Sequence, residues 1–418
     1  PGGASKETWS FSVVTAHGSE RRLILRADRT AGGPGLATEA DVLRAAHRAG
    51  VPVPAVVVSG DGSDGIGVAY MVVEFIDGET IARRILRDDE FEAARGMLAA
   101  QCGTILARIH EIPVGDLAGL SGADPLPQLR SQLDQLGQPH PAFELGLLWL
   151  AEHQPERRLD RFVHGDFRNG NLIVGPEGIR AVLDWELAHL GDPVEDLAWL
   201  CVKAWRFGSA PPVGGFGEID DLVGAYEAAG GETVDRDVLH WWIVEGTLHW
   251  GVICIAQAFT HRSGAFRSVE LAAIGRRVCE VESDLLELLP WGSGTAAPST
   301  PPSGEADDGA PHDVPTAVEL LDAVHEFLAS DAVPATEGRI RFHLRVAANV
   351  VAMVGRQIEL GPAQRRAHEE RLGRLDVRSE AELATAIRSG DFAGRLAEVT
   401  DAVRATVADK LSVANPRY

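Results

Sequence analysis

The chain has 418 residues, of which 45% are hydrophobic and 24% are charged, a composition typical of a globular protein with roughly two or three cores. Its 39 Lys and Arg residues against 61 Asp and Glu residues give a net charge of -22, which is the wrong sign for a protein that binds nucleic-acid phosphates. We expect no nucleic-acid partner, no membrane span, no signal peptide and a cytoplasmic location with reduced cysteines, because the sequence shows neither a long apolar run nor paired cysteine spacings.

The first predicted elements are two strands joined by a short turn. Residues 8–14 and 22–26 are rich in β-branched and apolar side chains, and the turn falls at residues 17–19. A glycine-rich stretch, residues 2–7, comes before the first strand. Glycines there would allow backbone N–H groups to approach phosphate oxygens. Such a stretch is also typical of flexible chain, so both interpretations stay open.

Helix and strand alternate in the next part of the chain. A helix is expected over residues 38–49, because prolines follow at once, and an apolar strand over residues 70–78, where a glycine turn ends it. Apolar side chains recur every three or four residues over residues 91–110, which predicts an amphipathic helix. Residues 115–141 are rich in Gly, Pro, Asp and Gln and predict an irregular excursion.

One stretch carries most of the recognisable chemistry. From His164 the sequence reads HGDFRNGNLIV, so Asn171 follows Asp166 by five residues. Two short apolar segments then predict a hairpin that brings Asp184 beside Asn171. This set suits phosphoryl transfer: one carboxylate orients the attacking hydroxyl, while the amide and the other carboxylate hold Mg²⁺ against the phosphates of ATP. The alternative is a turn whose polar groups only satisfy the backbone.

The remainder of the chain is predicted to be helical apart from one linker. Asp192 is a candidate N-cap, and helical patterns continue over residues 221–289. Residues 292–315 are too poor in apolar side chains to pack and predict a flexible linker. Further helices are expected over residues 317–328, 340–360 and 380–411. We expect Gly361–Pro362 to end the second of them.

The motifs resemble those of a known family. HGDxxxxN and the LDWE at residues 183–186 resemble the aminoglycoside-phosphotransferase-like branch of the protein-kinase-like fold. HGDxRxGN and the later GDPxxDLAW are more similar to small-molecule kinases related to the kinase domains of certain acyl-CoA dehydrogenase fusion proteins. The resemblance implies an α+β, bilobal protein-kinase-like fold with a small β-rich N-lobe and a larger helical C-lobe.

The same resemblance implies a division into four parts. Residues 1–78 would be the nucleotide-binding N-lobe, and residues 79–291 the C-lobe with the catalytic loop and the acceptor pocket. The linker at residues 292–315 would lead to a small all-α bundle at residues 316–418. This bundle resembles a helical domain of unknown function. A homo-oligomer contact and a site for a protein partner are both open for it.

The resemblance also implies catalytic and metal-binding roles. Asp166 would orient the acceptor hydroxyl, and Asn171 and Asp184 would bind Mg²⁺. Arg168 would stabilise the transferring phosphoryl group, or else brace the loop. His164, Asp192 and Asp196 are expected to support the site structurally.

Further residues are implied to contact ATP. Arg26 lies where this fold commonly has a lysine that pairs with phosphates, and Glu39 would be its ion-pair partner. The alternative is an ordinary surface pair that contributes little. The other implied contacts come from the glycine-rich stretch and from the backbone of the hinge strand: Ser5, Lys6, Glu74, Phe75 and Ile76.

The implied function is a kinase that depends on ATP and Mg²⁺ and transfers the γ-phosphate to a hydroxyl of a small molecule. The closer resemblance favours a hydroxyacyl thioester or a related metabolite as acceptor. An aminoglycoside is an alternative, because a polycation suits an acidic protein. A second alternative is a pseudokinase or interaction module that binds nucleotide without transferring phosphate.

Overall fold

The structure is a computed structural model that describes residues 6–14, 18–28, 36–117, 120–156, 158, 160–292, 296–299 and 315–418. Ser5 and the glycines before it, for which the resemblance implies contact with nucleotide, lie outside the described residues. The chain forms two compact units, one of residues 1–124 with 154–246 and the other of residues 125–153 with 247–418. Each unit is described by itself.

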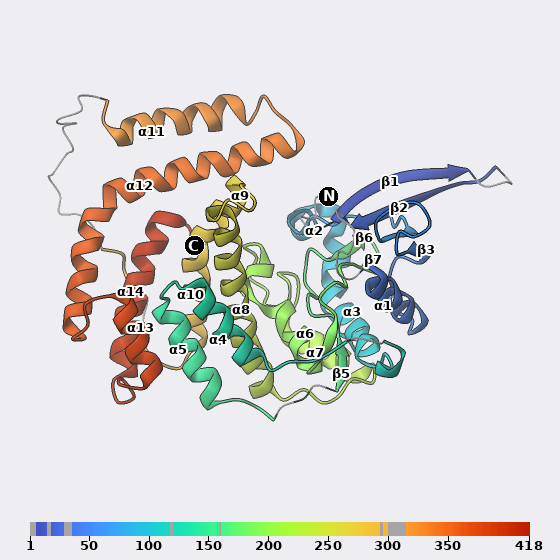
Figure 1. Cartoon of the computed structure of the whole chain (residues 1–418), viewed down its shortest axis with the longest axis horizontal. Helices are drawn as coiled ribbons and strands as arrows, with labels where there is room; N and C mark the ends of the chain where they lie inside the picture. Colours follow the sequence, from blue (N-terminus) through green and yellow to red (C-terminus); the bar gives the residue numbers. More distant parts are fainter. Residues whose placement is uncertain are drawn as a thin grey trace. The chain divides into compact units, whose positions relative to one another are not determined.

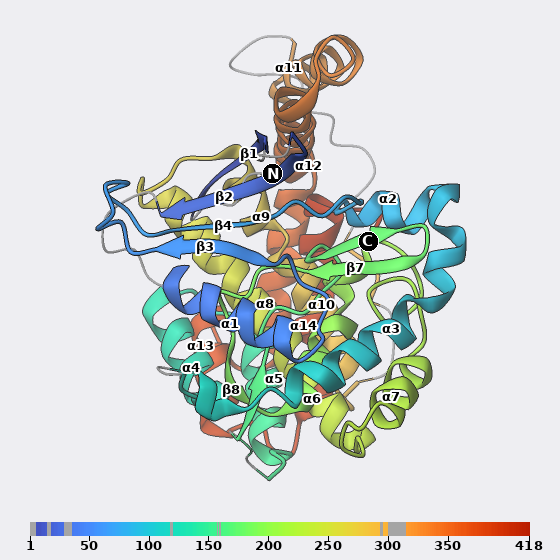
Figure 2. The same cartoon turned by 90° about the vertical axis from the view of Figure 1, so that its right-hand side faces the viewer.

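A four-stranded antiparallel sheet begins the first unit (Figure 1). The strands are β1 (Lys6–Val14), β2 (Glu20–Asp28), β3 (Val56–Gly60) and β4 (Tyr70–Glu74), in the order β1-β2-β4-β3. Helix α1 (Leu36–Arg48) packs against β3 and β4 through its buried apolar residues, as Figure 2 shows. The predicted β-rich N-terminal part is therefore confirmed.

The rest of the first unit is mainly helical. Its helices are α2 (Ala82–Arg87), α3 (Glu92–His110), α6 (Pro193–Cys201) and α7 (Ile219–Ala228), with short 3-10 turns at Asp89–Phe91, Val114–Asp116 and Lys203–Arg206. Two small antiparallel ribbons lie among them: β5 (Arg161–Val163) with β8 (His189–Gly191), and β6 (Leu172–Gly175) with β7 (Gly178–Val182). The second ribbon is the predicted hairpin. Asp192 caps α6 as predicted, since its side chain accepts the N–H of Val194.

The second unit is helical throughout its described part. It contains α4 (Pro125–Leu136), α5 (Pro141–Glu152), most of α8 (Arg236–Arg262), α9 (Val269–Arg276) and α10 (Val278–Leu288). After the linker come α11 (Ala317–Glu326), a π-helical turn (Phe327–Ala332), α12 (Gly338–Arg374), α13 (Glu380–Ser389) and α14 (Leu396–Ala414). Together with the N-terminal sheet, these helices confirm the predicted α+β class.

Two local predictions are wrong. Gly361–Pro362 does not end a helix, because α12 continues through Pro362 to Arg374. The proline removes one backbone N–H, and α12 bends in its middle, while packing against α14 holds the second half in place (Figure 1). The excursion predicted over residues 115–141 contains α4, which buries Leu129 and Leu133 four residues apart.

Helices on both sides of the linker share one core. Helices α13 and α14 pack against α5, and α14 also packs against α10. Leu145 and Leu285 from before the linker are fully buried. Ile387 and Val399 from after the linker are at most 1% exposed. The hydrophobic effect therefore couples the two sequence segments within this unit.

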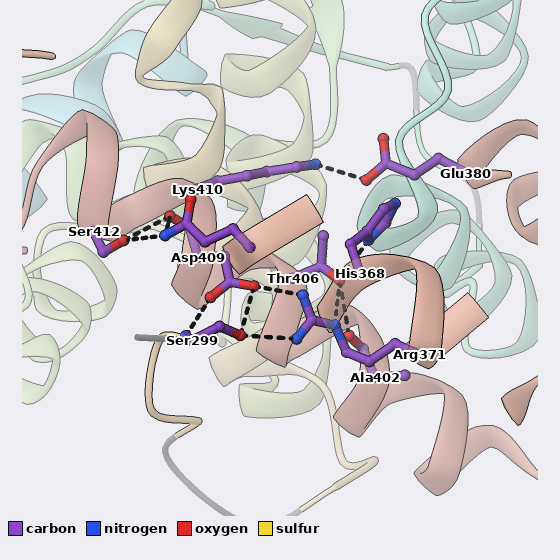
Figure 3. Close-up of polar contacts among 10 residues, drawn as sticks. Ser299, His368, Arg371, Glu380, Ala402, Thr406, Asp409, Lys410 and Ser412 are labelled. Atoms are coloured by element: carbon purple, nitrogen blue, oxygen red, sulfur yellow. Dashed lines mark hydrogen bonds and ion pairs between the residues drawn. The ribbon is translucent and has the colours of Figure 1, made fainter. Parts of the chain in front are cut away.

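Polar contacts reinforce that core (Figure 3). The Arg371 side chain on α12 is paired with Asp409 on α14, and Asp409 also accepts the backbone N–H of Ser299. The ammonium group of Lys410 lies 3.2 Å from Glu380 and 3.4 Å from Glu282. Burial opposes its charge, but these carboxylates raise the pKa of Lys410.

Helix α8 and the four cysteines are the features that relate to a membrane span and to disulfides. Among the described residues, α8 alone is long and apolar enough to cross a membrane, and 72% of its most apolar window is buried inside the structure. Core helices commonly pass this test when they are buried in this way. The four cysteines are buried and free, as their spacing predicts.

We predict that Glu144 on α5 contributes more to the free energy of unfolding than its partner Arg388 on α13 does. Glu144 is buried and accepts hydrogen bonds from Arg130 (2.7 and 2.8 Å) and from Arg388 (2.8 Å). Glu144→Ala should lower the free energy of unfolding by about 2 kcal/mol, since it removes the acceptor of charge-assisted hydrogen bonds from two arginines. Arg388→Ala should cost about 1 kcal/mol or less, because Arg388 is half exposed and Arg130 remains.

Urea denaturation followed by circular dichroism measures both changes, with Arg395→Ala, which removes an exposed pair with Glu398, as the control. Burial would raise the pKa of Glu144, but Arg130 and Arg388 hold it below its ordinary value. The contribution of Glu144 should therefore be present above its ordinary pKa and be lost as the pH falls through the lowered one. Equal, small effects of Glu144→Ala and Arg388→Ala would contradict this assignment.

Candidate active site

The tight turn at Gly165 sets the geometry of the candidate site. Gly165 has φ +77°, and a Cβ atom there would lie 2.4 Å from the carbonyl oxygen of Leu187, so only glycine fits. The buried carboxylate of Asp196 accepts the backbone N–H groups of His164 (2.7 Å) and Gly165 (2.9 Å). Asp196 thereby holds the backbone of this loop in place.

Asp196 is itself held in its charged form. Its Oδ2 lies 3.1 Å from Nε2 of His110, and Nδ1 of His110 lies 3.0 Å from the hydroxyl of Tyr226. Burial would raise the pKa of Asp196, but the hydrogen bonds and charge of these neighbours lower it. This explains why a fully buried carboxylate can hold the backbone of the loop.

His164 braces the loop, as the sequence predicts. Its Nδ1 accepts the backbone N–H of Asp166 (3.1 Å), so Nε2 carries the hydrogen and donates to the carbonyl of Leu183 (3.1 Å). Burial lowers the pKa of His164, which keeps the ring neutral. The histidine therefore joins the loop of Asp166 to the segment that precedes Asp184.

The Asp166 carboxylate is oriented by three donors. Its Oδ1 accepts hydrogen bonds from Nε of Arg168 (2.8 Å) and from Nε1 of Trp199 (2.8 Å), and its Oδ2 accepts one from the Asn171 amide (2.6 Å). The guanidinium of Arg168 also lies 4.5 Å from the centre of the Trp205 ring, which is a cation–π contact. Arg168 therefore holds the Asp166 carboxylate in place in this structure.

Asn171 and Asp184 come together through the backbone. The N–H of Leu183 donates to the carbonyl of Asn171 (2.8 Å), which places the next residue, Asp184, beside Asn171. Asp184 has φ +66°, a left-handed conformation that is uncommon for a residue with a Cβ. Burial and the neighbouring carboxylates, Glu186 first among them, raise the pKa of Asp184.

Two cations converge on Glu39. The carboxylate of Glu39 is buried and pairs with Arg26 through one oxygen and with Lys6 through the other (2.5 Å). Arg26 also lies 3.6 Å from Asp184, and Lys6 lies 3.1 Å from Glu186. The network thus connects the N-terminal sheet and α1 to the segment that carries Asp184, and the predicted pair of Arg26 with Glu39 is present.

The predicted hinge residues are partly engaged within the sheet. The N–H of Glu74 donates to the carbonyl of Ala55 (3.0 Å), and that of Phe75 donates to the carbonyl of Arg22 (3.2 Å). The side chain of Glu74 pairs with Arg21 at the surface. The predicted contact with an adenine edge therefore narrows to Ile76 and to the carbonyl groups of this segment.

The donor set of the site fits magnesium shared with a nucleotide. The described residues contain no group of three or more His, Cys, Asp and Glu side chains placed to hold a metal by themselves. Mg²⁺ is commonly held by one or two protein oxygens together with phosphates and water. Asn171 and Asp184 supply such oxygens, and a divalent cation would favour the charged form of Asp184, whose pKa is raised by burial and then by the neighbouring carboxylates.

Sequence reasoning missed Trp199 and Trp205, which contact Asp166 and Arg168. It also treated Lys6 only as part of a glycine-rich loop, and it did not foresee the contact with Glu186. The GDPxxDLAW motif, which ends in Trp199, was the available signal. Only the packing of α6 against β5 brings that residue to the catalytic loop.

Two family models and a solved structure match large parts of the chain. A family model described as "Phosphotransferase enzyme family" matches residues 4–242, and one described as a domain of unknown function (DUF6285) matches residues 334–418. A solved structure from Ralstonia eutropha JMP134, provisionally described as an aminoglycoside phosphotransferase, has a TM-score of 0.54 and 21% identity, with 69% of this chain and 93% of that chain covered. At this identity the likeness concerns the fold alone, and it confirms the predicted protein-kinase-like fold.

The curated relatives are much longer proteins. Acyl-CoA dehydrogenase family member 10 of Mus musculus is 34% identical over 190 residues, which are 43% of this chain and 18% of the relative. Acyl-CoA dehydrogenase family member 11 of Homo sapiens is 29% identical over 175 residues, which are 38% of this chain and 22% of the relative. The matches thus span about a fifth of these relatives. Because the first family model covers more than half of the chain, the chain belongs to the phosphotransferase enzyme family.

Proposed function

We propose that the protein uses ATP and Mg²⁺ to transfer the γ-phosphate to a hydroxyl of a small molecule. The observation that carries the proposal is the junction of Asp166, Asn171 and Asp184. The side-chain amide of Asn171 donates to the Asp166 carboxylate, while the backbone carbonyl of Asn171 accepts the N–H of Leu183, which precedes Asp184. In this proposal Asp166, which orients the acceptor, lies beside Asn171 and Asp184, which bind the metal, as in-line phosphoryl transfer requires.

Asp166 acts on the acceptor in this proposal. Hydrogen bonds to Trp199, Arg168 and Asn171 fix the plane of its carboxylate. A hydroxyl that donates to this carboxylate is held with its oxygen lone pair directed away from Asp166, towards the phosphoryl group. Asp166 receives the proton as the oxygen–phosphorus bond forms and the bond to the leaving ADP oxygen breaks.

Asn171 and Asp184 hold the metal through oxygen atoms. The Asn171 nitrogen already donates to Asp166, so its amide oxygen is directed elsewhere. Bound Mg²⁺ would neutralise charge on the phosphates during transfer. Arg26 and Lys6 position the triphosphate. Glu39 holds both cations, and they lie close to Asp184 and Glu186.

The surroundings of Asp166 favour an acceptor with an apolar part. The Trp199 indole donates to the Asp166 carboxylate, and the Trp205 ring lies against the guanidinium of Arg168, whose charge is paired with that of Asp166. We therefore favour a hydroxyacyl thioester or a related metabolite, and the names of the curated relatives, which refer to acyl-CoA dehydrogenases, support this choice.

Two measurements test the proposal. A thermal-shift titration with ATP, with and without Mg²⁺, measures nucleotide binding. An ADP-release screen over hydroxyacyl thioesters, other hydroxylated metabolites and aminoglycosides measures transfer. Stabilisation by nucleotide without turnover on any acceptor would favour a pseudokinase, and turnover confined to aminoglycosides would overturn the proposed acceptor class.

The first prediction separates the two aspartates. Asp184→Asn should abolish the Mg²⁺-dependent part of the ATP-induced thermal shift, because it removes the anionic metal ligand. Asp166→Asn should leave that shift unchanged and lower kcat about 10²- to 10⁴-fold, as expected for loss of the group that accepts the proton. The same loss of nucleotide binding in both variants would contradict the assignment.

The second prediction concerns the cations held by Glu39. Arg26→Ala and Lys6→Ala should each weaken ATP binding roughly ten- to a hundredfold, since losing a charge-assisted phosphate contact costs about 1.5–3 kcal/mol. Arg26→Lys should fall between Arg26→Ala and the unaltered protein, because it keeps the charge without the fork. Arg44→Ala removes an exposed arginine of α1 and serves as the control in ATP titration calorimetry. Unchanged affinity in Arg26→Ala would leave Lys6 as the phosphate ligand.

The third prediction concerns Trp199 as a positioning residue. Trp199→Phe keeps an aromatic ring but removes the donor to Asp166, so kcat should fall about tenfold while the KM for ATP stays unchanged. Steady-state kinetics at varied ATP separates these parameters, and Trp241→Phe, a buried tryptophan of α8, serves as the control. A parallel loss of thermal stability and of ATP affinity would show that Trp199 acts through packing alone.

A further inference from the structure

Helix α11 presents an apolar stripe to the solvent. Leu320, Val324 and Phe327 follow one another at spacings of four and three residues, so they share one face of the helical segment. Their exposed fractions are 54%, 48% and 59%. Helix α11 packs along the first half of α12, with His325 on the contacting side, to form a helical hairpin (Figures 1 and 2).

The first half of α12 also carries an apolar stripe. Its stripe consists of Ile340, Leu344, Ala347, Val351, Val354 and Ile358, with spacings that alternate between four and three residues. Ile340, Val354 and Ile358 are exposed and the other three are only half-buried. A repeat of this kind, with a period near 3.5 residues, is typical of helices that pack lengthwise against other helices over about 27 Å.

The hairpin is held in a defined geometry. Thr316 and Glu319 form a capping box at the start of α11. The Nδ1–H of His325 on α11 donates to the carbonyl of Ala348 on α12 (2.9 Å), which fixes how the two helices are placed along each other. Two helices with exposed stripes form one layer of a bundle, and such a layer buries its apolar side chains only against a second layer.

The charges of the hairpin identify what that second layer is. Residues 317–332 carry Glu319, Asp322, Glu326 and Asp331 and no Lys or Arg, whereas residues 338–358 carry Arg339, Arg341, Arg345 and Arg356 and no Asp or Glu. One helix is therefore acidic and its neighbour basic. A two-fold axis that places α11 of one copy on α12 of the other brings opposite charges together twice, so the surface is complementary to itself.

We propose that the protein dimerises through this hairpin, with residues 317–358 of two copies forming an antiparallel four-helix bundle. The apolar stripes lie inside the bundle, and the acidic α11 of each copy lies along the basic half of α12 of its partner. The interface is isologous, so it closes at two copies and leaves no open surface for a filament. This inference does not depend on the proposed phosphotransfer chemistry.

Sedimentation velocity and light scattering on the full chain test the proposal. The expected mass is twice the 44.7 kDa of one chain. A double variant of α11, Asp322→Arg with Glu326→Arg, and a double variant of α12, Arg339→Glu with Arg345→Glu, should each be monomeric, because like charges then face each other at both contacts. All four side chains are exposed, so these changes leave the fold of the monomer intact.

Mixing the two double variants gives the decisive result. The α11 variant places arginine at positions 322 and 326 and keeps a basic α12, whereas the α12 variant places glutamate at positions 339 and 345 and keeps an acidic α11. An equimolar mixture pairs these opposite charges at both contacts and should recover the dimer mass as a heterodimer. Arg365→Glu with Arg366→Glu makes the same charge change in the second half of α12 and should leave the dimer unchanged. Circular dichroism confirms that each variant is folded.

An apolar variant gives an independent reading. Leu320→Ser with Ile340→Ser keeps every charge and should weaken the dimer at least tenfold in dissociation constant. A monomeric unaltered protein across the concentration range would overturn the proposal and would mean that the hairpin is covered by a different protein. A dimer that survives both double charge variants would also overturn it, since the copies would then meet through another surface.

Discussion

The buried carboxylate of Asp196 is the constraint on which the candidate site depends. It accepts two successive N–H groups of the loop that carries Asp166, and it can remain charged without solvent because His110 and the loop itself supply the compensating hydrogen bonds. An unpaired charge at this depth would be very unfavourable. Asp196, His110 and Tyr226 come from three different helices, so the position of the catalytic loop is set by the packing of the helical part of the unit.

A second constraint is the balance of charge around Glu39. Two cations and three carboxylates, Glu39, Asp184 and Glu186, meet where β1, β2 and α1 approach the Asp184 segment. The acids outnumber the bases, and burial together with the neighbouring acids raises the pKa of Asp184. In the proposed reaction the excess is an advantage, because a divalent cation adds positive charge where the acids need it. Arg26 and Lys6 can then turn from the acids towards phosphate oxygens.

Local pattern was sufficient for part of this site. The hairpin of β6 and β7 and the N-cap at Asp192 follow from apolar spacing and from capping chemistry, and both are encoded within about ten residues. The same holds for the bracing role of His164, since its partners lie in the motif or directly after the hairpin. The pair of Arg26 with Glu39 could be named only through the family resemblance, because the two residues lie on different elements.

Features that depend on long-range packing could not be found in this way. The contact of Trp199 with Asp166 needs the position of α6, and the contact of Lys6 with Glu186 joins residues 180 positions apart in the numbering. Helix α4 was missed because prolines and glutamines hide the spacing of Leu129 and Leu133. Helix α12 was expected to stop at Pro362, where packing against α14 outweighs the loss of one hydrogen bond.

The linker marks a change of composition, but it does not mark a boundary of packing. Helix α5 lies within the segment matched by the phosphotransferase model, yet it belongs to the same compact unit as α13 and α14. Nine of the twelve residues of α5 are buried, and Glu144 among them is held by an arginine from before the linker and another from after it. A segment with so large a buried share needs cover on several sides, and the C-terminal helices provide part of it. The domain of unknown function therefore has at least one structural role in this chain, which is to complete the core around α5.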